Sequence, residues 1–211
     1  MFFVNGMIKN LVFDMGGVLI RFDPDAVLTE HGITDPGDRE IFKKEVFRSA
    51  EWSDYDRGTV TKDAFLDCIA RLPEKYRPLA HRMLIERVFA ANDMPHVEGM
   101  YELISYFKSK GLRIYLLSNA GQDFYVYGKT IPAISLFDGL FVSSDWHLLK
   151  PEPEIYDKFF ELFSLDPSEC LFVDDLPANI EGAKARGMDG ICWCTSRQSV
   201  EELKSRIEER L

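Results

Sequence analysis

The sequence predicts an α/β fold, in which a parallel sheet is covered by helices on both sides and a small helical subdomain is inserted. Two observations predict this class. Short apolar runs rich in β-branched and aromatic residues alternate with helical patterns along most of the chain. These runs are apolar at nearly every position, which is typical of strands buried on both faces of a parallel sheet.

Five apolar runs are the candidate strands of this sheet. They are NLVF at 10–13, RIYLLS at 113–118, GLFVS at 139–143, CLFV at 170–173 and GICWC at 190–194. Helical patterns precede the second and fourth runs and separate the last two, and each closes with a glycine or a turn. They are VEGMYELISYFKSKG, PEIYDKFFELFS and PANIEGAKARG.

Residues 21–94 interrupt this alternation with helical, polar-faced segments and no convincing strand. The segments are DREIFKKEVFRSAEW at 38–52, TKDAFLDCIARL at 61–72 and YRPLAHRMLIERVFAA at 76–91. We therefore expect a core made of residues 1–20 and 95–211, and an inserted helical subdomain made of residues 21–94. The charged tail SVEELKSRIEERL predicts a solvated terminal helix.

Composition narrows the class of partner. The chain has 211 residues with 35 acidic and 25 basic side chains, which gives a net charge of −10. A molecule of this charge is repelled by nucleic acid and by anionic membranes. The sequence has no signal-peptide pattern and no apolar run near the ~20 residues that span a bilayer. We expect a cytoplasmic protein that acts on a small ligand, and the sequence makes no prediction of its oligomeric state.

The predicted strands end in polar residues, and ligands of parallel α/β sheets bind outside the carboxyl ends of the strands. Each of these residues taken alone is well explained as a helix cap or a turn. Their joint occurrence at several strand ends points to a site. The residues are Asp14, Ser118 with Asn119, Lys150 in the segment after the third run, and Asp174 with Asp175.

This set of residues suits phosphate chemistry. A carboxylate attacks phosphorus when a divalent cation offsets the repulsion between the two anions, and water then cleaves the acyl phosphate. Magnesium favours oxygen ligands and commonly takes one or two carboxylates. A hydroxyl, an amide and an ammonium group then hold the remaining phosphoryl oxygens.

Four short motifs occur in a fixed order, and together they resemble the motifs of the haloacid dehalogenase-like hydrolases. They are FDMGGV, LLSN, KPEPEIY and VDDLPANIEGA, with the helical insertion after the first. The resemblance covers essentially the whole chain. It implies a Rossmann-like sheet core, a Mg²⁺ cofactor and a small helical cap at residues 21–94.

The resemblance also implies roles for individual residues. Asp14 matches the nucleophile and a metal ligand, and Gly16 matches the position whose backbone carbonyl binds the metal. Ser118, with Asn119 beside it, matches the phosphate-binding hydroxyl motif, for which a helix cap is the alternative. Lys150 matches the lysine that braces the nucleophile and the phosphate, for which a solvated surface lysine is the alternative.

Asp174 and Asp175 match the acidic pair that holds magnesium directly or through water, with Asp175 expected as the direct ligand. A helix cap alone would explain one of them. Two adjacent carboxylates at the end of a buried strand are costly without a cation, which favours the metal interpretation. Asn179, four residues after Asp175, is expected to orient the loop or cap the following helix.

The cap is expected to select the substrate, and EWSDYDRGTVT at 51–61 is its candidate contact segment. Trp52 and Tyr55 are suited to stacking on a ring, and Arg57 is suited to pairing with an anionic group. The alternative for all three is ordinary packing between helices and capping of a helix that begins near Thr61.

One departure from the family pattern concerns the reaction. Many phosphatases and phosphomutases of the family have DxD in the first motif, and the second aspartate protonates the leaving group. This chain has DMG, and Gly16 carries no proton to donate. General acid catalysis contributes ~100- to 10,000-fold, so its absence restricts the substrate unless another group replaces it.

Three functions compete on this basis. A 2-haloacid dehalogenase also lacks the second aspartate, but it needs no metal and its fourth motif does not resemble VDDLPAN. A catalytically weak phosphate-binding or regulatory protein would have lost the nucleophile, the lysine or the acids, and all of them are present. The third function is a phosphatase whose leaving group needs little protonation, or which obtains the proton from bound water or from the cap.

We expect the third function, a magnesium-dependent phosphatase acting on a small phosphorylated metabolite. The glycine after the nucleophile, the RG-containing cap segment and KPE-x-IY look most similar to the branch that contains sugar-1-phosphate phosphatases and the phosphatase domain of soluble epoxide hydrolase. A sugar phosphorylated at its anomeric carbon is one substrate that releases a relatively acidic hydroxyl. The natural substrate does not follow from the sequence.

Overall fold

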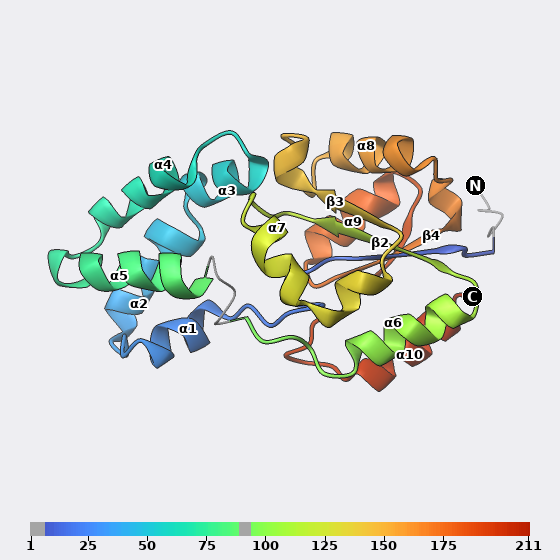
Figure 1. Cartoon of the computed structure of the whole chain (residues 1–211), viewed down its shortest axis with the longest axis horizontal. Coiled ribbons are helices and arrows are strands. Elements are labelled where there is room, and N and C mark those ends of the chain that lie inside the picture. The colour runs from blue at the N-terminus through green and yellow to red at the C-terminus, as the bar shows by residue number, and fades with distance from the viewer. Residues whose placement is uncertain (1–6, 89–93) are drawn as a thin grey trace.

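The computed structural model describes residues 7–88 and 94–211 of the chain, and its centre is a sheet of five parallel strands (Figure 1). The strand order is β3-β2-β1-β4-β5. The strands are β1 Asn10–Phe13, β2 Arg113–Ser118, β3 Gly139–Val142, β4 Cys170–Asp174 and β5 Asp189–Cys192. The predicted α/β class is confirmed, and all five predicted runs form strands.

Strand β1 lies in the middle of the sheet, and its neighbours set the position of the site. Phe13 pairs with Leu116 of β2 on one side and with Val173 of β4 on the other. The backbone N–H of Asp14 continues the ladder and donates to the Val173 carbonyl at 2.8 Å. The chain leaves β1 toward β2 and β3 on one side and later returns to β4 and β5 on the other. The carboxyl end of β1 is therefore the switch point at which parallel α/β sheets bind ligands.

Helices cover both faces of the sheet and enclose two hydrophobic clusters. On one face pack α6 Met100–Ser109, α7 Phe124–Tyr127 and α10 Val200–Glu208, and on the other pack α8 Pro153–Phe163 and α9 Pro177–Ala185. Figure 1 shows α6 and α10 side by side. Short 3₁₀ helices connect the larger elements: η5 Gly128–Thr130, η6 Pro132–Leu136, η7 Ser143–Asp145 and η8 Pro167–Glu169.

The expectation of a solvated terminal helix is wrong for one face of α10. Leu203 and Ile207 are fully buried and belong to the same cluster as α6. The two residues are four apart, so they lie on one face of the helix, and the charged residues occupy the other. No helix of the described residues has both the length and the apolar composition required to cross a membrane.

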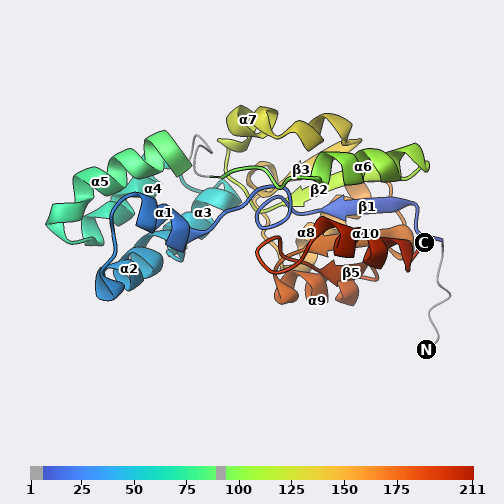
Figure 2. The ribbon, with the colours of Figure 1, turned by 90° about the horizontal axis from the view of Figure 1, so that it is seen from below.

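The elements that the described residues form between β1 and α6 are all helices, and the segment from α1 to η4 is called the cap below. Its elements are α1 Pro24–Glu30, α2 Pro36–Phe42, η1 Lys43–Phe47, α3 Ala50–Arg57, α4 Lys62–Leu66, η2 Asp67–Arg71, η3 Glu74–Tyr76, α5 Arg77–Arg82 and η4 Met83–Val88. Figures 1 and 2 both place the cap beyond the carboxyl ends of the strands. The last three residues of the helix expected at 76–91 lie outside the described residues.

Side-chain caps determine where several helices of the cap begin. Asp23, Asp35, Ser49 and Thr61 each accept a hydrogen bond from a backbone N–H in the first turn of the helix that follows. The predicted helix at 38–52 is therefore interrupted, with α2 and η1 before Ser49 and α3 after it. Ser49 has an extended backbone and caps α3, so the helical path is broken before that helix starts.

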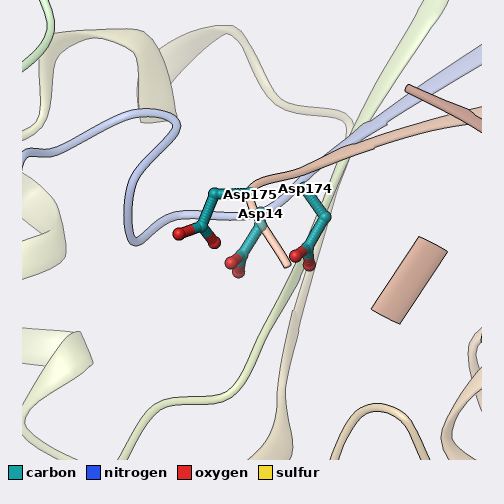
Figure 3. A group of neighbouring side chains, drawn as sticks. All are labelled: Asp14, Asp174 and Asp175. Carbon is teal, nitrogen blue, oxygen red and sulfur yellow. The ribbon is translucent and has the colours of Figure 1, made fainter. Parts of the chain in front are cut away.

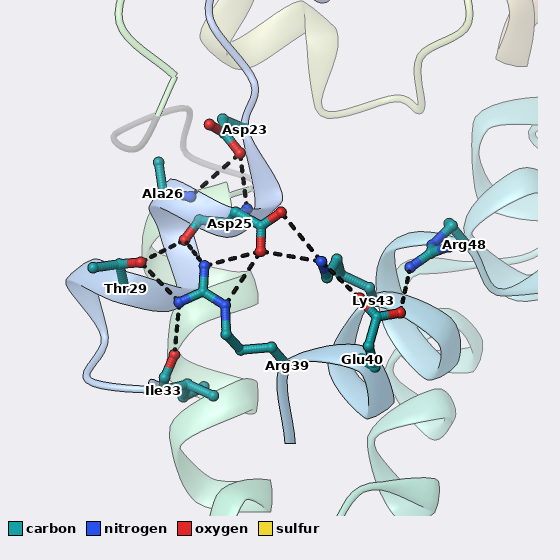
Figure 4. Close-up of polar contacts among 9 residues, drawn as sticks. All are labelled: Asp23, Asp25, Ala26, Thr29, Ile33, Arg39, Glu40, Lys43 and Arg48. Atoms are coloured by element: carbon teal, nitrogen blue, oxygen red, sulfur yellow. Dashed lines mark hydrogen bonds and ion pairs between the residues drawn. The ribbon is translucent and has the colours of Figure 1, made fainter. Parts of the chain in front are cut away.

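The cap has a hydrophobic cluster of its own, built around Phe42, Phe65 and Leu84. A polar network fastens its first two helices together (Figure 4). The guanidinium of Arg39 donates from Nη2 to the Asp25 carboxylate at 2.9 Å and to the Asp25 carbonyl at 2.7 Å. These bonds join α1 to α2.

Candidate active site

Three carboxylates meet at the carboxyl ends of β1 and β4. Asp14, Asp174 and Asp175 each offer an oxygen, and these oxygens lie within 4.8 Å of one another. Figure 3 shows the three side chains pointing to the same side of the strand ends. The pairing of β1 with β4 produces this proximity, because it places Asp14 beside Asp174.

Lys150 joins two of these acids. Its ammonium lies 2.8 Å from Oδ1 of Asp14 and 2.6 Å from Oδ2 of Asp174. Burial alone would lower the pKa of Lys150, but the charges of the two facing carboxylates outweigh it and raise the pKa. The lysine is therefore a buried positive charge between the two strand ends. It is not a solvated surface lysine.

Asn119 holds the backbone of Lys150 in place. Its side-chain oxygen accepts from the Lys150 N–H at 2.9 Å, and its side-chain nitrogen donates to the Lys150 carbonyl at 3.0 Å. Asn119 also lines the cavity described below, whereas Ser118 is only 1% exposed and does not line it. Helix α7 begins after Asp123, so neither residue caps it. The phosphate-binding role of Ser118 stays a prediction.

The two neighbouring aspartates of β4 have different surroundings. Asp174 is fully buried, and Nδ2 of Asn179 donates to both of its oxygens at 3.0 Å. The backbone N–H of Leu176 donates to Oδ1 of Asp174 at 2.8 Å. Asp175 is only partly buried and lines the cavity. Asp175 is thus the more accessible of the two for a cation.

Burial and mutual repulsion raise the pKa values of the Asp14 and Asp175 carboxyl groups, and a bound cation would offset both effects. Burial raises the pKa of Asp14 to about 7, and the charges of Asp174 and Asp175 add to the effect while Lys150 opposes it. Burial and the charge of Asp174 raise the pKa of Asp175 to about 6. A divalent cation stabilises the ionised form of carboxylates that lie so close together. Magnesium suits this site because it favours oxygen ligands.

Gly16 lies at the open side of this group. It lines the cavity, and a Cβ at this position would meet no atom within 4 Å. Gly17 is different, because it has φ +69° and a Cβ there would lie 2.6 Å from Oδ2 of Asp175. A side chain is therefore tolerated at the position of the missing acid but not at the next one.

A cavity of about 330 Å³ extends from the acids toward the cap. Much of its wall is apolar or aromatic, from both the core and the cap. These residues are Met15, Ile20, Phe22, Trp52, Tyr55, Met94, Tyr127 and Leu176. Lys150 is the one cationic residue among the described residues that line the cavity. The cavity therefore suits an organic group that carries little or no negative charge beyond the phosphate.

The structure places two of the three predicted substrate contacts at the cavity. Trp52 and Tyr55 line it, and Trp52 also stacks on Phe22 with ring centroids 5.7 Å apart. Arg57 does not line the cavity, and its role as a substrate contact stays a prediction. Its guanidinium pairs with Glu152 at 2.5 Å, because it lies five residues after Trp52 and points to another side of α3.

Two acids of the cavity were missed by the sequence analysis. Asp56 of the cap lines it and is partly buried, and Asp123 of the core lines it and accepts from the Tyr55 hydroxyl. For Asp56 a signal was present in the sequence. It lies four residues after Trp52, so both side chains share one face of a helix. For Asp123 no pattern in the sequence indicates a position at the site.

Comparison with known proteins identifies the class. Residues 8–187 match the family model of the haloacid dehalogenase-like hydrolases, so the chain belongs to this family and is a hydrolase. The resemblance expected from the four motifs is confirmed, and so is the expected enzyme class.

The similar proteins include phosphatases. The sesquiterpene phosphatase astK of Aspergillus oryzae is 26% identical over 200 residues, 94% of this chain and 96% of the relative. The D-ribitol-5-phosphate phosphatase of Bacteroides thetaiotaomicron is 26% identical over 193 residues, 87% of this chain and 90% of the relative.

Solved structures share the fold. A HAD-like family hydrolase of Porphyromonas gingivalis superposes with a TM-score of 0.70 at 21% identity, over 96% of this chain and 98% of that one. A HAD family enzyme of Bacteroides thetaiotaomicron, solved in complex with magnesium and inorganic phosphate, superposes with a TM-score of 0.66 at 21% identity, over 93% and 98% of the two chains.

Proposed function

We propose that this hydrolase is a magnesium-dependent phosphatase that cleaves the monophosphate ester of a small metabolite through an aspartyl-phosphate on Asp14. The observation that carries the proposal is the position of the Asp14 carboxylate. It lines the cavity, lies 2.8 Å from the Lys150 ammonium and is grouped with two further acids. The phosphatase relatives and the magnesium and phosphate complex of the structural neighbour support it.

Asp14, Asp175 and the backbone carbonyl of Gly16 would hold the magnesium ion, with Asp174 beside them. When bound, magnesium offsets the repulsion between the carboxylate nucleophile and the phosphate. The donor set fits the ion, because all three side chains are carboxylates and the pKa of Asp14 is raised by its acidic neighbours as well as by burial.

The residues of the chain act on the phosphate in two steps. A carboxylate oxygen of Asp14 attacks phosphorus and forms the aspartyl-phosphate as the ester bond to the alcohol breaks. Water then attacks the phosphorus and restores the Asp14 carboxylate. Lys150 offsets charge on the phosphoryl oxygens in both steps, and Asn119 is a positioning residue because it holds the Lys150 backbone.

The cavity restricts the alcohol part of the substrate. Its apolar wall suits a hydrocarbon chain, a ring or the apolar face of a sugar. The cavity disfavours a second phosphate or a carboxylate in the same space, because no additional cation lines the described part of the cavity to pair with it. Uncharged alcohols such as prenyl, benzyl or sugar hydroxyl compounds are therefore the favoured class.

The same feature disfavours a 2-haloacid dehalogenase. Such a substrate carries a carboxylate next to the reacting carbon, and a cation is needed to hold it. Lys150 is already paired with Asp14 and Asp174. The adjacent acids Asp174 and Asp175 also favour a reaction that uses a metal over one that needs none.

The test is a panel of phosphorylated metabolites together with 2-chloropropionate, assayed with magnesium and with a chelator. We expect phosphate release that requires magnesium and is abolished in Asp14→Asn. Asp189→Asn, at the start of β5 and at the other end of the sheet, is the matched control and should keep its activity.

Two results would contradict the proposal. Halide release in the presence of chelator would assign the chain to carbon-halogen chemistry. Absence of turnover across the panel, together with tight magnesium-dependent binding of inorganic phosphate, would favour a phosphate-binding protein.

A further inference from the structure

The cap places the carboxyl group of Asp56 at the cavity. At the position where DxD enzymes have their second acid, this chain has Gly16. We propose that Asp56 donates the proton to the leaving alcohol and later accepts a proton from the attacking water. This inference rests on the phosphatase reaction proposed above. Asp56 lines the same cavity as Asp14 and Gly16, but it comes from α3 of the cap and not from the strand end.

Contacts with the core fix the position of Asp56. The hydroxyl of Ser143, which follows β3, donates to the Asp56 carbonyl at 2.6 Å. The next residue, Arg57, pairs with Glu152 of the core at 2.5 Å. At Gly58 the backbone of the cap passes so close to Ser144 that any Cβ would overlap it. Three consecutive residues are therefore anchored, and a group held in this way meets the geometric demand of proton transfer.

The surroundings of the Asp56 carboxyl group favour its protonated form at neutral pH. The pKa of Asp56 is raised to about 8, chiefly by burial and to a smaller extent by the charge of Asp14. Hydrogen bonds from the Trp52 side chain and the Gly121 backbone oppose this shift without cancelling it. A carboxyl group with a pKa near the working pH serves well both as acid and, after ionising, as base.

The other ionisable groups of the cavity fit this role less well. Both carboxyl oxygens of Asp123 already have partners, because Oδ1 pairs with Lys62 at 3.1 Å and Oδ2 accepts from the Tyr55 hydroxyl. Burial raises the pKa of Tyr55 and of Tyr127 far above the neutral range, which makes both weak acids. Lys150 is occupied by two carboxylates.

The proposed reaction balances in bonds and protons over its two steps. In the first step an Asp14 oxygen forms a bond to phosphorus, and the bond from phosphorus to the ester oxygen breaks. The ester oxygen keeps the electron pair and takes the proton of Asp56, so a neutral alcohol leaves. In the second step water forms a bond to phosphorus and gives a proton back to Asp56, while the bond from phosphorus to Asp14 breaks.

The experiment compares two substrates of similar size that differ in their need for a proton. Benzyl phosphate releases an alkoxide unless it is protonated, whereas 4-nitrophenyl phosphate releases a stable phenolate. With magnesium present, Asp56→Asn should lower kcat for benzyl phosphate by ~100-fold or more and change kcat for 4-nitrophenyl phosphate by less than about 5-fold. Asp54→Asn, the same change on α3 at a residue that does not line the cavity, should change neither rate.

A second variant tests whether the lost function is a proton. Gly16 has open space around a Cβ, so Gly16→Asp places a carboxyl group at the position used in DxD enzymes. The double variant with Gly16→Asp and Asp56→Asn should recover at least about a tenth of the wild-type rate on benzyl phosphate. Acid-quenched samples of each variant are also assayed for phosphate bound to the protein.

Each outcome decides the inference. Equal losses on both substrates, no loss on either, or no recovery in the double variant would overturn the role of Asp56 while phosphate bound to the protein still supports Asp14. If the wild-type protein hydrolyses neither substrate and traps no phosphate, the proposed phosphatase fails, and the role of Asp56 fails with it.

Discussion

Oδ2 of Asp174 lies 2.6 Å from the ammonium of Lys150, and neither side chain is more than 1% exposed to solvent. The contact joins the end of β4 to the loop that follows β3, and it crosses over the end of β1. A buried charge that loses its partner is costly, whereas one that keeps it is held in a single geometry. The ion pair therefore orders the site before any ligand arrives.

Lys150→Met should destabilise the protein when a chelator is present. The change leaves Asp14 and Asp174 without their shared cation, and we expect the free energy of unfolding to fall by about 3 to 5 kcal/mol. Urea denaturation measures it. Lys158→Met is the control, since Lys158 pairs with Glu161 on the surface of α8, and its loss should be below about 1 kcal/mol. Equal losses in the two variants would contradict the structural role of the ion pair.

Magnesium should stabilise the folded protein even without substrate. The three grouped carboxylates are relieved of their repulsion by the ion, and a ligand at about 100 times its Kd adds roughly 2.7 kcal/mol to the free energy of unfolding. Thermal unfolding with magnesium and with chelator measures the effect. Asp175→Asn should reduce the stabilisation and Asp189→Asn should not, so an unchanged response in Asp175→Asn would remove Asp175 from the metal site.

Asp56→Asn should make the protein more stable at neutral pH. The pKa of Asp56 rises from 3.8 to about 8 in the native state. Between these two values the native state keeps a proton that the unfolded state has released, so this group lowers stability as the pH rises. An amide does not titrate, and we expect a gain of roughly 1 to 3 kcal/mol at pH 7, which is smaller than the full shift because the cavity admits solvent.

Denaturation of both proteins at several pH values checks this prediction. The gain should be small at pH 3, where the native and the unfolded state both hold most of the proton, and it should approach its full size near pH 8. A gain that does not change with pH would show that Asp56 is not a buried acid with a raised pKa.

In Asp56→Asn, kcat for benzyl phosphate should no longer depend on a group with a pKa near 8. In the wild-type protein kcat should fall as the pH rises through about 8, because the acid loses its proton. The other ionisable groups that line the described part of the cavity are Asp14, which raises the pKa of Asp56, and Tyr55, Asp123, Tyr127, Lys150 and Asp175. The same decline in Asp56→Asn would assign the titration to another of these groups.

Gly58→Ala should impair catalysis through the position of the cap. Gly58 has φ +74°, and a Cβ there would overlap the Ser144 backbone of the core. Gly32 has φ +75° but no atom within 4 Å of such a Cβ, so Gly32→Ala carries the same backbone strain without the overlap. Both should lose ~1 to 2 kcal/mol of stability. Only Gly58→Ala should lose kcat/KM, by about 10- to 100-fold on either phosphate, and parallel losses would contradict a role of this contact.

The main features of the core could be predicted from local patterns. Each buried strand is a short apolar run, and Asp14, Asp174 and Lys150 follow such runs closely enough for their convergence to be expected. The parallel order of the strands then brings them together. The orientation of Asn119 could not be predicted, because its hydrogen bonds join backbone atoms of residues 31 positions away.

The cap was less predictable. Trp52 and Tyr55 line the cavity as expected, but Arg57 turns away to Glu152 and Asp56 takes a place at the cavity instead. A helix offers several faces, and the face that meets the core depends on how the cap docks. That docking is set by contacts at Ser143 and Ser144, which are far from α3 in the sequence.

The sequence by itself determined the α/β class, the family, and the aspartates and lysine of the strand ends. It did so because strand periodicity and short motifs are local properties that each segment carries independently. The tertiary structure decided which cap residues face the cavity, how Asn119 holds Lys150, and that Asp56 of the cap lines the same cavity as Gly16. These features depend on contacts between segments distant in the chain, which no local pattern encodes.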